Sequence, residues 1–179
     1  MVFVPAGTLH AINEGILLFE IQQKSDLTYR VYDYDRRDAS GRPRELHLDK
    51  ALDVIDYAPP AQVKVPPLAL APGRDLLVAC PYFALERHSY VESVPLNTRA
   101  TSFEIWTLLE GEARVAGVDV RASESLVLPA SLGPYEIAPR EPAVLLRCYV
   151  PDLEQDLIGP LRAAGYEEAS IRATVRPAP

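Results

Sequence analysis

The sequence predicts an all-β fold, a sandwich or barrel with a few short helices, and three observations support this expectation. Short segments rich in Val, Ile, Leu, Phe and Tyr recur along the chain, each bounded by Gly, Pro or Asp. This rhythm of strands and turns is typical of an all-β sandwich or barrel. Only two stretches have a helical pattern, and one apolar strand-to-turn sequence occurs twice. The 179 residues suffice for one good-sized core or two small ones.

The expected strands lie on both sides of a proline-rich stretch. Each combines β-branched or aromatic residues with turn residues at its ends, a pattern that is typical of β-strands. We expect strands at residues 1–5, 14–22, 28–34, 76–88, 101–109, 112–120, 125–129, 133–138 and 143–150.

Two stretches predict helices instead of strands. A first helix is expected from Leu48 to Ile55, because its apolar residues recur at i, i+3, i+4 and i+7. A second helix is expected to begin after Asp152, which with Gln155 forms a capping box, and to run toward Gly165. Both helices are short, so they leave the fold class unchanged.

A proline-rich segment divides the chain into units. Six Pro and Gly residues lie between Tyr57 and Arg74, and they exclude a central strand there. We therefore expect a first unit with a short helix at residues 1–58 and a linker at 59–74. A second β unit is expected at 75–151, followed by a helix and tail at 152–179, whose end is expected to be frayed.

A short repeat suggests that the two units are equivalent. The sequence "FVPA" at residues 3–6 returns as "VLPA" at residues 127–130, and in both places an apolar strand enters a turn of small residues. The second unit has strands upstream of this turn, whereas the first unit has none. If the repeat reflects duplication, half of the first barrel is absent from this chain.

Composition excludes several classes of function. The net charge is −7 and no block of Lys or Arg is present, so we expect no nucleic-acid partner. No apolar stretch approaches the roughly 20 residues that span a bilayer, and no secretory signal is visible, so we expect no membrane partner and a cytoplasmic location. Cys80 and Cys148 are too few for a disulfide framework and are expected to be buried free thiols.

Chemistry-bearing residues concentrate in the first unit. His10 follows a Pro-Ala-Gly turn, and strict alternation places Glu20 on one strand face with apolar residues. Tight turns and strands could bring His10, Glu20, Asp26, Arg30 and Arg36 to one cavity. For each residue an ordinary structural role is the alternative: a solvated face for Glu20, a surface or satisfied core histidine for His10, and an ion pair with Asp33 or Asp35 for Arg30.

These stretches resemble a known family. The runs "PAGTLHAI", "LLFEIQQKSDLTYRVYDYDR" and "GRPRELHLDKALDVI" are similar to type I mannose-6-phosphate isomerases of the short bacterial form, which are tandem-cupin zinc enzymes. The match is dense over residues 2–56 and weaker over 75–151, where "EGEARV" and "LVLPASLGPYEI" look like the second cupin. The resemblance implies an all-β cupin (jelly-roll) fold with the C-terminal part of a first cupin and a complete, metal-free second cupin.

The resemblance also implies an activity and residue roles. It implies isomerisation between mannose 6-phosphate and fructose 6-phosphate through an enediol, with a sugar phosphate as ligand and Zn2+ as cofactor. His10 matches the last zinc ligand, Glu20 the proton-transferring acid/base and Asp26 a ring-opening residue. Arg30 matches the active-site arginine, and Arg36 falls where some relatives have a substrate-binding lysine. This chain would supply one zinc ligand, since the others precede this stretch in the family.

Two hypotheses of different class follow from that ligand count. In the first, the chain is the C-terminal portion of an isomerase, truncated by a late start or by design. In the second, it is a natural short protein, a cupin-like sugar-binding or interaction module without catalysis. Such a module could complete its open barrel as a homodimer through unpaired strand edges.

Overall fold

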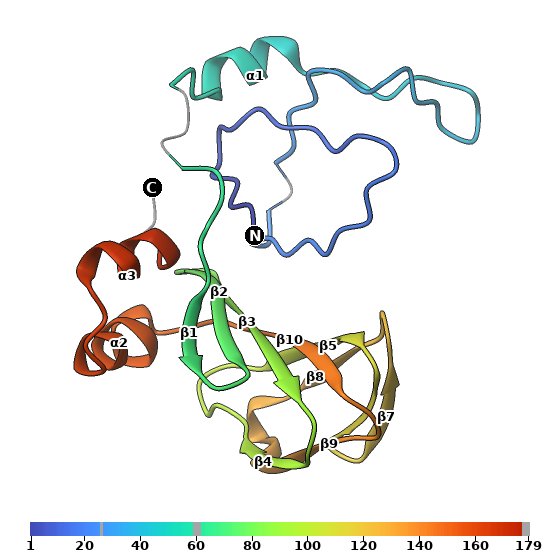
Figure 1. Cartoon of the computed structure of the whole chain (residues 1–179). Coiled ribbons are helices and arrows are strands. Elements are labelled where there is room, and N and C mark those ends of the chain that lie inside the picture. Colours follow the sequence, from blue (N-terminus) through green and yellow to red (C-terminus); the bar gives the residue numbers. More distant parts are fainter. Residues whose placement is uncertain (26, 59–61, 177–179) are drawn as a thin grey trace. The chain divides into compact units, whose positions relative to one another are not determined.

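The computed structural model describes residues 1–25, 27–58 and 62–176, so the predicted site residue Asp26 and the start of the predicted linker lie outside the described residues. The chain divides into two compact units (Figure 1). Unit 1 contains Met1–Phe3 and the chain from Lys64 onward, and unit 2 contains Val4–Val63. The linker predicted over residues 59–74 stays a prediction.

The described residues of unit 1 form ten strands. They are β1 (Leu68–Ala71), β2 (Arg74–Cys80), β3 (Phe83–Tyr90), β4 (Val94–Asn97), β5 (Glu104–Glu110), β6 (Glu112–Val115), β7 (Val118–Arg121), β8 (Ser125–Leu128), β9 (Pro134–Pro139) and β10 (Ala143–Tyr149). Six of the predicted segments, from 76–88 to 143–150, correspond to β2, β3 and β5 to β10. The strands in this part of the sequence are therefore confirmed, and 76–88 and 112–120 each form two strands.

The two sheets of unit 1 make a jelly roll. One sheet has the order β1-β2-β3-β10-β5-β8 and the other β4-β9-β6-β7, and every pair between neighbouring strands is antiparallel. Strands β3 to β10 run as two nested Greek keys that share the two sheets, which is the eight-strand jelly-roll topology. Strands β1 and β2 extend one sheet at its edge. The predicted all-β class is confirmed.

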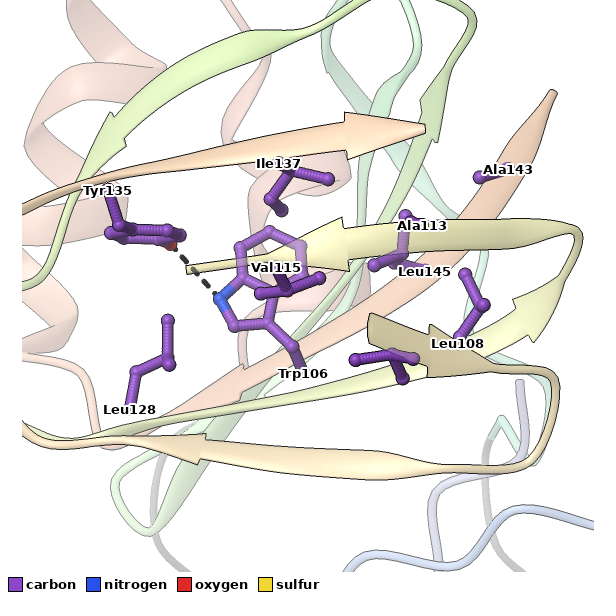
Figure 2. Packing of buried hydrophobic residues seen from close by; sticks show 10 residues of the cluster. Trp106, Leu108, Ala113, Val115, Leu128, Tyr135, Ile137, Ala143 and Leu145 are labelled. Atoms are coloured by element: carbon purple, nitrogen blue, oxygen red, sulfur yellow. Dashed lines mark hydrogen bonds between the residues drawn. The ribbon is translucent and has the colours of Figure 1, made fainter. Parts of the chain in front are cut away.

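An apolar core fills the space between the two sheets (Figure 2). Its side chains come from both sheets, so burying them joins the layers. The core comprises Trp106, Leu108, Ala113, Val115, Val120, Leu128, Tyr135, Ile137, Ala143 and Leu145. Trp106 Nε1 donates to the hydroxyl of Tyr135 on the opposite sheet, at 3.0 Å.

Short helices follow β10 and cover a second apolar cluster. A 3₁₀ turn, η1 (Ala130–Leu132), lies within the jelly roll, and a π-helical turn, η2 (Leu153–Ile158), leads into α2 (Gly159–Ala163) and α3 (Glu168–Thr174). Asp152 Oδ1 accepts from the amide of Gln155 at 2.9 Å, so this predicted cap is confirmed. The tail was expected to fray, but α3 packs instead: Ile171 and Val175 are buried with Leu76 and Ala79.

Two strands were not predicted, and each lies at the edge of its sheet. β1 lies at an edge of the six-stranded sheet, where the preceding prolines cost no central hydrogen bonds. β4 contains Pro95 and lies at an edge of the four-stranded sheet.

Cys80 and Cys148 are buried free thiols, as expected, and burial raises the pKa of Cys148 to about 12.

Unit 2 contains one helix and long irregular segments. The predicted helix is confirmed as α1 (Leu48–Val54), with Ala51 buried. The strands predicted at 1–5, 14–22 and 28–34 do not form within the described residues, where only isolated bridges at Val2 and Arg37 occur. A strand exists through hydrogen bonds to a neighbouring strand, and these segments have no ladder partner in the described part of the chain. Leu17 is accordingly 99% exposed.

The Pro-Ala-Gly turn that opens unit 2 is held against the end of α1. The amide of Thr8 donates to the carbonyl of Pro5 at 3.2 Å, and the amide of Asp56 donates to the carbonyl of Gly7 at 2.9 Å. Gly7 has φ +81°, and a Cβ there would lie 2.8 Å from the Val54 carbonyl oxygen, so glycine is required.

Among the described residues, every helix is too short or too polar to cross a lipid bilayer.

Candidate functional site

Two segments of unit 2 enclose a polar hollow that contains two of the predicted site residues. The hollow has a volume of about 490 Å3 and is open to solvent. A hydrogen bond of 3.3 Å from the Tyr34 hydroxyl to Asn13 Oδ1 joins its two walls. The lining residues are His10, Ala11, Ile12, Asn13, Glu14, Gly15, Ile16, Tyr32, Asp33, Tyr34 and Arg36. The structure therefore brings His10 and Arg36 together.

The His10 ring is exposed, and its local contact fixes its tautomer. Nδ1 lies 2.9 Å from the carbonyl oxygen of Thr8. A carbonyl oxygen can only accept, so Nδ1 is the donor, and in the neutral ring Nε2 is the nitrogen with the lone pair. This is the arrangement of a metal-binding histidine, whose other ring nitrogen donates to a backbone carbonyl or a carboxylate.

The guanidinium of Arg36 is available for an anion. It lies 5.8 Å from the centroid of the Tyr34 ring, and its backbone amide donates to the Asp33 carbonyl at 3.0 Å. Among the described residues it has no carboxylate ion-pair partner, whereas Arg42 and Arg44 pair with Asp38 and Asp33. Arginine in such a position suits phosphate, because its planar donors match the phosphate oxygens.

Arg30 and Glu20 do not line the hollow. Arg30 is half-buried, with Nε 3.6 Å from Asp33 Oδ1 and NH1 donating to the Glu45 carbonyl at 3.3 Å. Its amide donates to Nδ1 of His47 at 3.2 Å, and its carbonyl accepts from the His47 amide at 2.8 Å. Glu20 is exposed, and the inward strand face expected for it is not formed.

A complete metal site is not present among the described residues. In this part of the chain no group of three or more His, Cys, Asp or Glu side chains could hold a metal ion. A catalytic zinc ion takes three protein ligands and keeps one position open. His10 therefore fits as a single ligand, and the described donor set does not fit a whole zinc centre.

Unit 1 contains a buried ionic network that the sequence reasoning missed. This interior network consists of Arg74, Glu86, His88, Tyr90, Glu104, Trp106, Tyr135, Arg147 and Tyr149. Arg74 is its partly exposed member, with a side chain that is 41% exposed. Glu86 and Glu104 are 0% exposed. Glu86 accepts two hydrogen bonds from Arg74, at 2.9 and 3.0 Å, and Glu104 accepts from Trp106, Tyr135 and Arg147.

The interior network satisfies its own charges. Burial is the largest influence on the Glu86 pKa and raises it, but hydrogen bonds from His88 and Arg74 and the nearby guanidinium charges outweigh burial and lower the pKa well below its usual range. Burial lowers the pKa of His88, so this ring is neutral at pH 7. His88 Nε2 donates to Glu86 at 2.9 Å and Nδ1 accepts from Tyr90 at 2.7 Å. Two carboxylates thus balance two guanidinium groups, and both nitrogens of the only histidine in the network are occupied.

Known proteins resemble this chain over much of its length. No family profile matches it. Mannose-6-phosphate isomerase of Streptococcus mutans is 37% identical over 136 residues, which cover 73% of this chain and 42% of that protein. Mannose-6-phosphate isomerase ManA of Bacillus subtilis is 38% identical over 143 residues, which cover 75% of this chain and 44% of that protein.

A solved structure agrees with this relationship. The crystal structure of the mannose 6-phosphate isomerase from Bacillus subtilis superposes with a TM-score of 0.58 at 26% identity, over 69% of this chain and 40% of that one. The chain is homologous to part of mannose-6-phosphate isomerase. It spans less than half the length of these relatives. The jelly roll of unit 1 is the fold that the sequence resemblance implied for residues 75–151.

The homology to mannose-6-phosphate isomerase leaves the individual site residues as predictions. The structure collects His10 and Arg36 at one hollow, sets Arg30 and Glu20 apart from it, and does not describe Asp26. The ion pair of Arg30 with Asp33, which the sequence offered as the ordinary structural role of Arg30, is confirmed at 3.6 Å, and Asp33 also lines the same hollow, which was not predicted. The signal was present, because Asp33 lies three residues after Arg30 in an arginine-rich segment.

Proposed function

We propose that this chain carries part of the active site of a mannose-6-phosphate isomerase, which interconverts mannose 6-phosphate and fructose 6-phosphate. Identity of 37–38% to proteins of that name supports the reaction. The geometric observation that carries the proposal is the hollow of unit 2, where an imidazole with a free Nε2 and an arginine without a carboxylate partner lie together. A sugar phosphate offers both a phosphate and vicinal oxygens to such a pair.

Each proposed residue has a role that its chemistry supports. Glu20 transfers the proton between C2 and C1, since a carboxylate near the substrate can act as base and then as acid. Arg30 stabilises the negative charge that develops on the enediolate oxygens, because a guanidinium stays ionised at every working pH. Arg36 binds the phosphate. Asp26 is proposed to assist opening of the sugar ring and lies outside the described residues.

His10 is proposed as one ligand of a zinc ion, which when bound supplies Lewis acidity to substrate oxygens. The described residues do not complete the ligand set of this zinc ion. We also propose that the protein acts in the cytoplasm, because sugar phosphates are charged metabolites that do not cross membranes unaided. A homodimer through strand edges remains a prediction.

The test is turnover of mannose 6-phosphate by the native protein and by Arg36→Ala. We expect fructose 6-phosphate to form, and the variant to raise KM for the substrate by about tenfold or more while kcat changes less, because a charge-assisted phosphate contact is removed. The matched control is Arg42→Ala, because the Arg42 side chain is 79% exposed and its guanidinium pairs with Asp38. Native protein that binds mannose 6-phosphate without turnover would favour a non-catalytic sugar-binding module, and an unchanged KM in Arg36→Ala would refute the role of Arg36.

A further inference from the structure

Asp33 lies where three arginines of unit 2 converge. Its side chain is 11% exposed, although it belongs to an irregular segment. Arg44 binds it with two donors: Nε donates to Oδ2 at 2.7 Å, and NH2 contacts Oδ1. Oδ1 also lies 3.6 Å from Nε of Arg30. The hydrogen bonds and charges of Arg44, with the charges of Arg30 and Arg36, hold the pKa of Asp33 below its usual range. Asp33 is therefore a fixed anion at neutral pH.

Arg30 is held on its other side by the segment that follows. NH1 donates to the carbonyl of Glu45 at 3.3 Å, and two hydrogen bonds join the Arg30 backbone to His47. The segment from Arg44 to His47 thus lies along the segment from Arg30 to Asp33. Within the described residues, NH1 makes one hydrogen bond, Nε takes part in an ion pair of 3.6 Å with Asp33, and NH2 has no protein partner. A guanidinium restrained in this way can present NH2 to a ligand.

We infer that Asp33, clamped by Arg44, is a positioning residue that orients the Arg30 guanidinium toward the substrate. This inference rests on the proposed function, in which Arg30 stabilises the enediolate. A free arginine side chain samples many rotamers, and a carboxylate anchor restricts it to the orientations that keep the ion pair. Asp33 carries one negative charge against the two positive charges of Arg30 and Arg44. The cluster therefore keeps a net positive charge, which suits an anionic substrate.

The inference predicts a split between kcat and KM in Asp33→Asn. The variant keeps the shape of the side chain but loses the charge that anchors Arg30. We expect kcat to fall by about 10²-fold, the loss typical of a misplaced catalytic group. KM for mannose 6-phosphate should stay unchanged or fall, because the site becomes more positive. Asp38→Asn is the matched control: Asp38 lies in the same segment, pairs with Arg42 at 3.4 Å, and should leave both constants unchanged.

A double-variant experiment separates positioning from a purely structural role. If Asp33 acts through Arg30, then Asp33→Asn adds no further loss of turnover in an Arg30→Ala background, and Asp33→Glu restores part of the activity. Losses that multiply in the double variant, or a kcat in Asp33→Asn equal to that of the native enzyme, would overturn the inference. A native protein without turnover would instead refute the proposed function, and full turnover in Arg30→Ala would refute the role of Arg30 on which the inference rests, so these failures are distinguishable. Thermal unfolding of each variant confirms that the protein assayed is folded.

Discussion

Arg147 on β10 meets Glu104 on β5 inside the jelly roll of unit 1, with Nε 3.1 Å from Oε2. The guanidinium also lies 3.7 Å from Glu86 and faces the rings of Trp106 and Tyr149. Arg147 thus links the two buried carboxylates of the interior network.

Removal of Arg147 should destabilise unit 1 strongly. Arg147→Met keeps most of the side-chain volume but leaves Glu104 and Glu86 short of positive charge in the interior. Loss of one partner of a buried ion pair costs about 3–5 kcal/mol in free energy of unfolding. Urea unfolding followed by the fluorescence of Trp106, the only tryptophan in the chain, measures this quantity in unit 1.

The matched control for Arg147→Met is Arg140→Met. Arg140 pairs with Asp119 at 2.7 Å, but both side chains are more than half exposed. An exposed ion pair contributes about 0–1 kcal/mol, so little change is expected. Equal effects of the two substitutions would contradict the view that burial makes the interior network critical.

The stability of unit 1 should fall in two steps as the pH is lowered. The folded-state pKa of His88 lies below its ordinary value of 6.5, so folding excludes a proton that the unfolded chain binds. The stabilisation is therefore complete above pH 6.5 and decreases below it, by up to about 1.4 kcal/mol per pH unit for one proton. The pKa values of Glu86 and Glu104 are also lowered, from 4.5, so their contribution is lost only below about pH 4.5.

The variant His88→Gln isolates the first of these steps. Glutamine can donate to Glu86 and accept from Tyr90 as the neutral histidine does, but it does not titrate. Urea midpoints measured from pH 8 to pH 5 should decline for the native chain and decline less for the variant. The same slope in both proteins would assign the pH dependence to groups other than His88.

Two glycines with the same backbone conformation should differ in their tolerance of alanine. Gly111 and Gly117 have φ values of +84° and +83°. A Cβ at Gly111 would lie 2.5 Å from the carbonyl oxygen of Pro142, whereas at Gly117 nothing lies within 4 Å. Gly117→Ala should cost about 1 kcal/mol from backbone strain alone. Gly111→Ala should cost about 3 kcal/mol or more, because a backbone clash is added. Thermal or urea unfolding measures both, and a larger loss in Gly117→Ala would contradict the packing of this turn.

The strands of unit 1 could be predicted from sequence because each strand finds its pairing partners within unit 1. β3 and β10 pair over their whole length, from Ala84 with Tyr149 to Tyr90 with Ala143, so local pattern and tertiary pairing agree. The stretches at 14–22 and 28–34 have equally strong β propensity. Propensity alone does not form a strand without a ladder partner, and the prediction failed there.

The expected convergence of the site residues on one cavity is met by His10 and Arg36 and not by Glu20 and Arg30. His10 and Arg36 follow turns set by local sequence, and the structure brings them to one hollow. The inward face expected for Glu20 depended on a sheet that does not form. The interior network was missed although Glu86, His88 and Tyr90 alternate on one face of β3, because their partners lie on other strands, Arg74 on β2 and Arg147 on β10, and the pattern along one strand does not show them.

The most direct test of the functional account is kcat for mannose 6-phosphate in Arg30→Ala, measured together with zinc content in the native protein and the variant. The account predicts a loss of at least about 10²-fold in kcat with zinc content unchanged, because Arg30 stabilises the enediolate and is not proposed as a metal ligand. Native turnover in Arg30→Ala would contradict the account, as would a native protein with no isomerase activity.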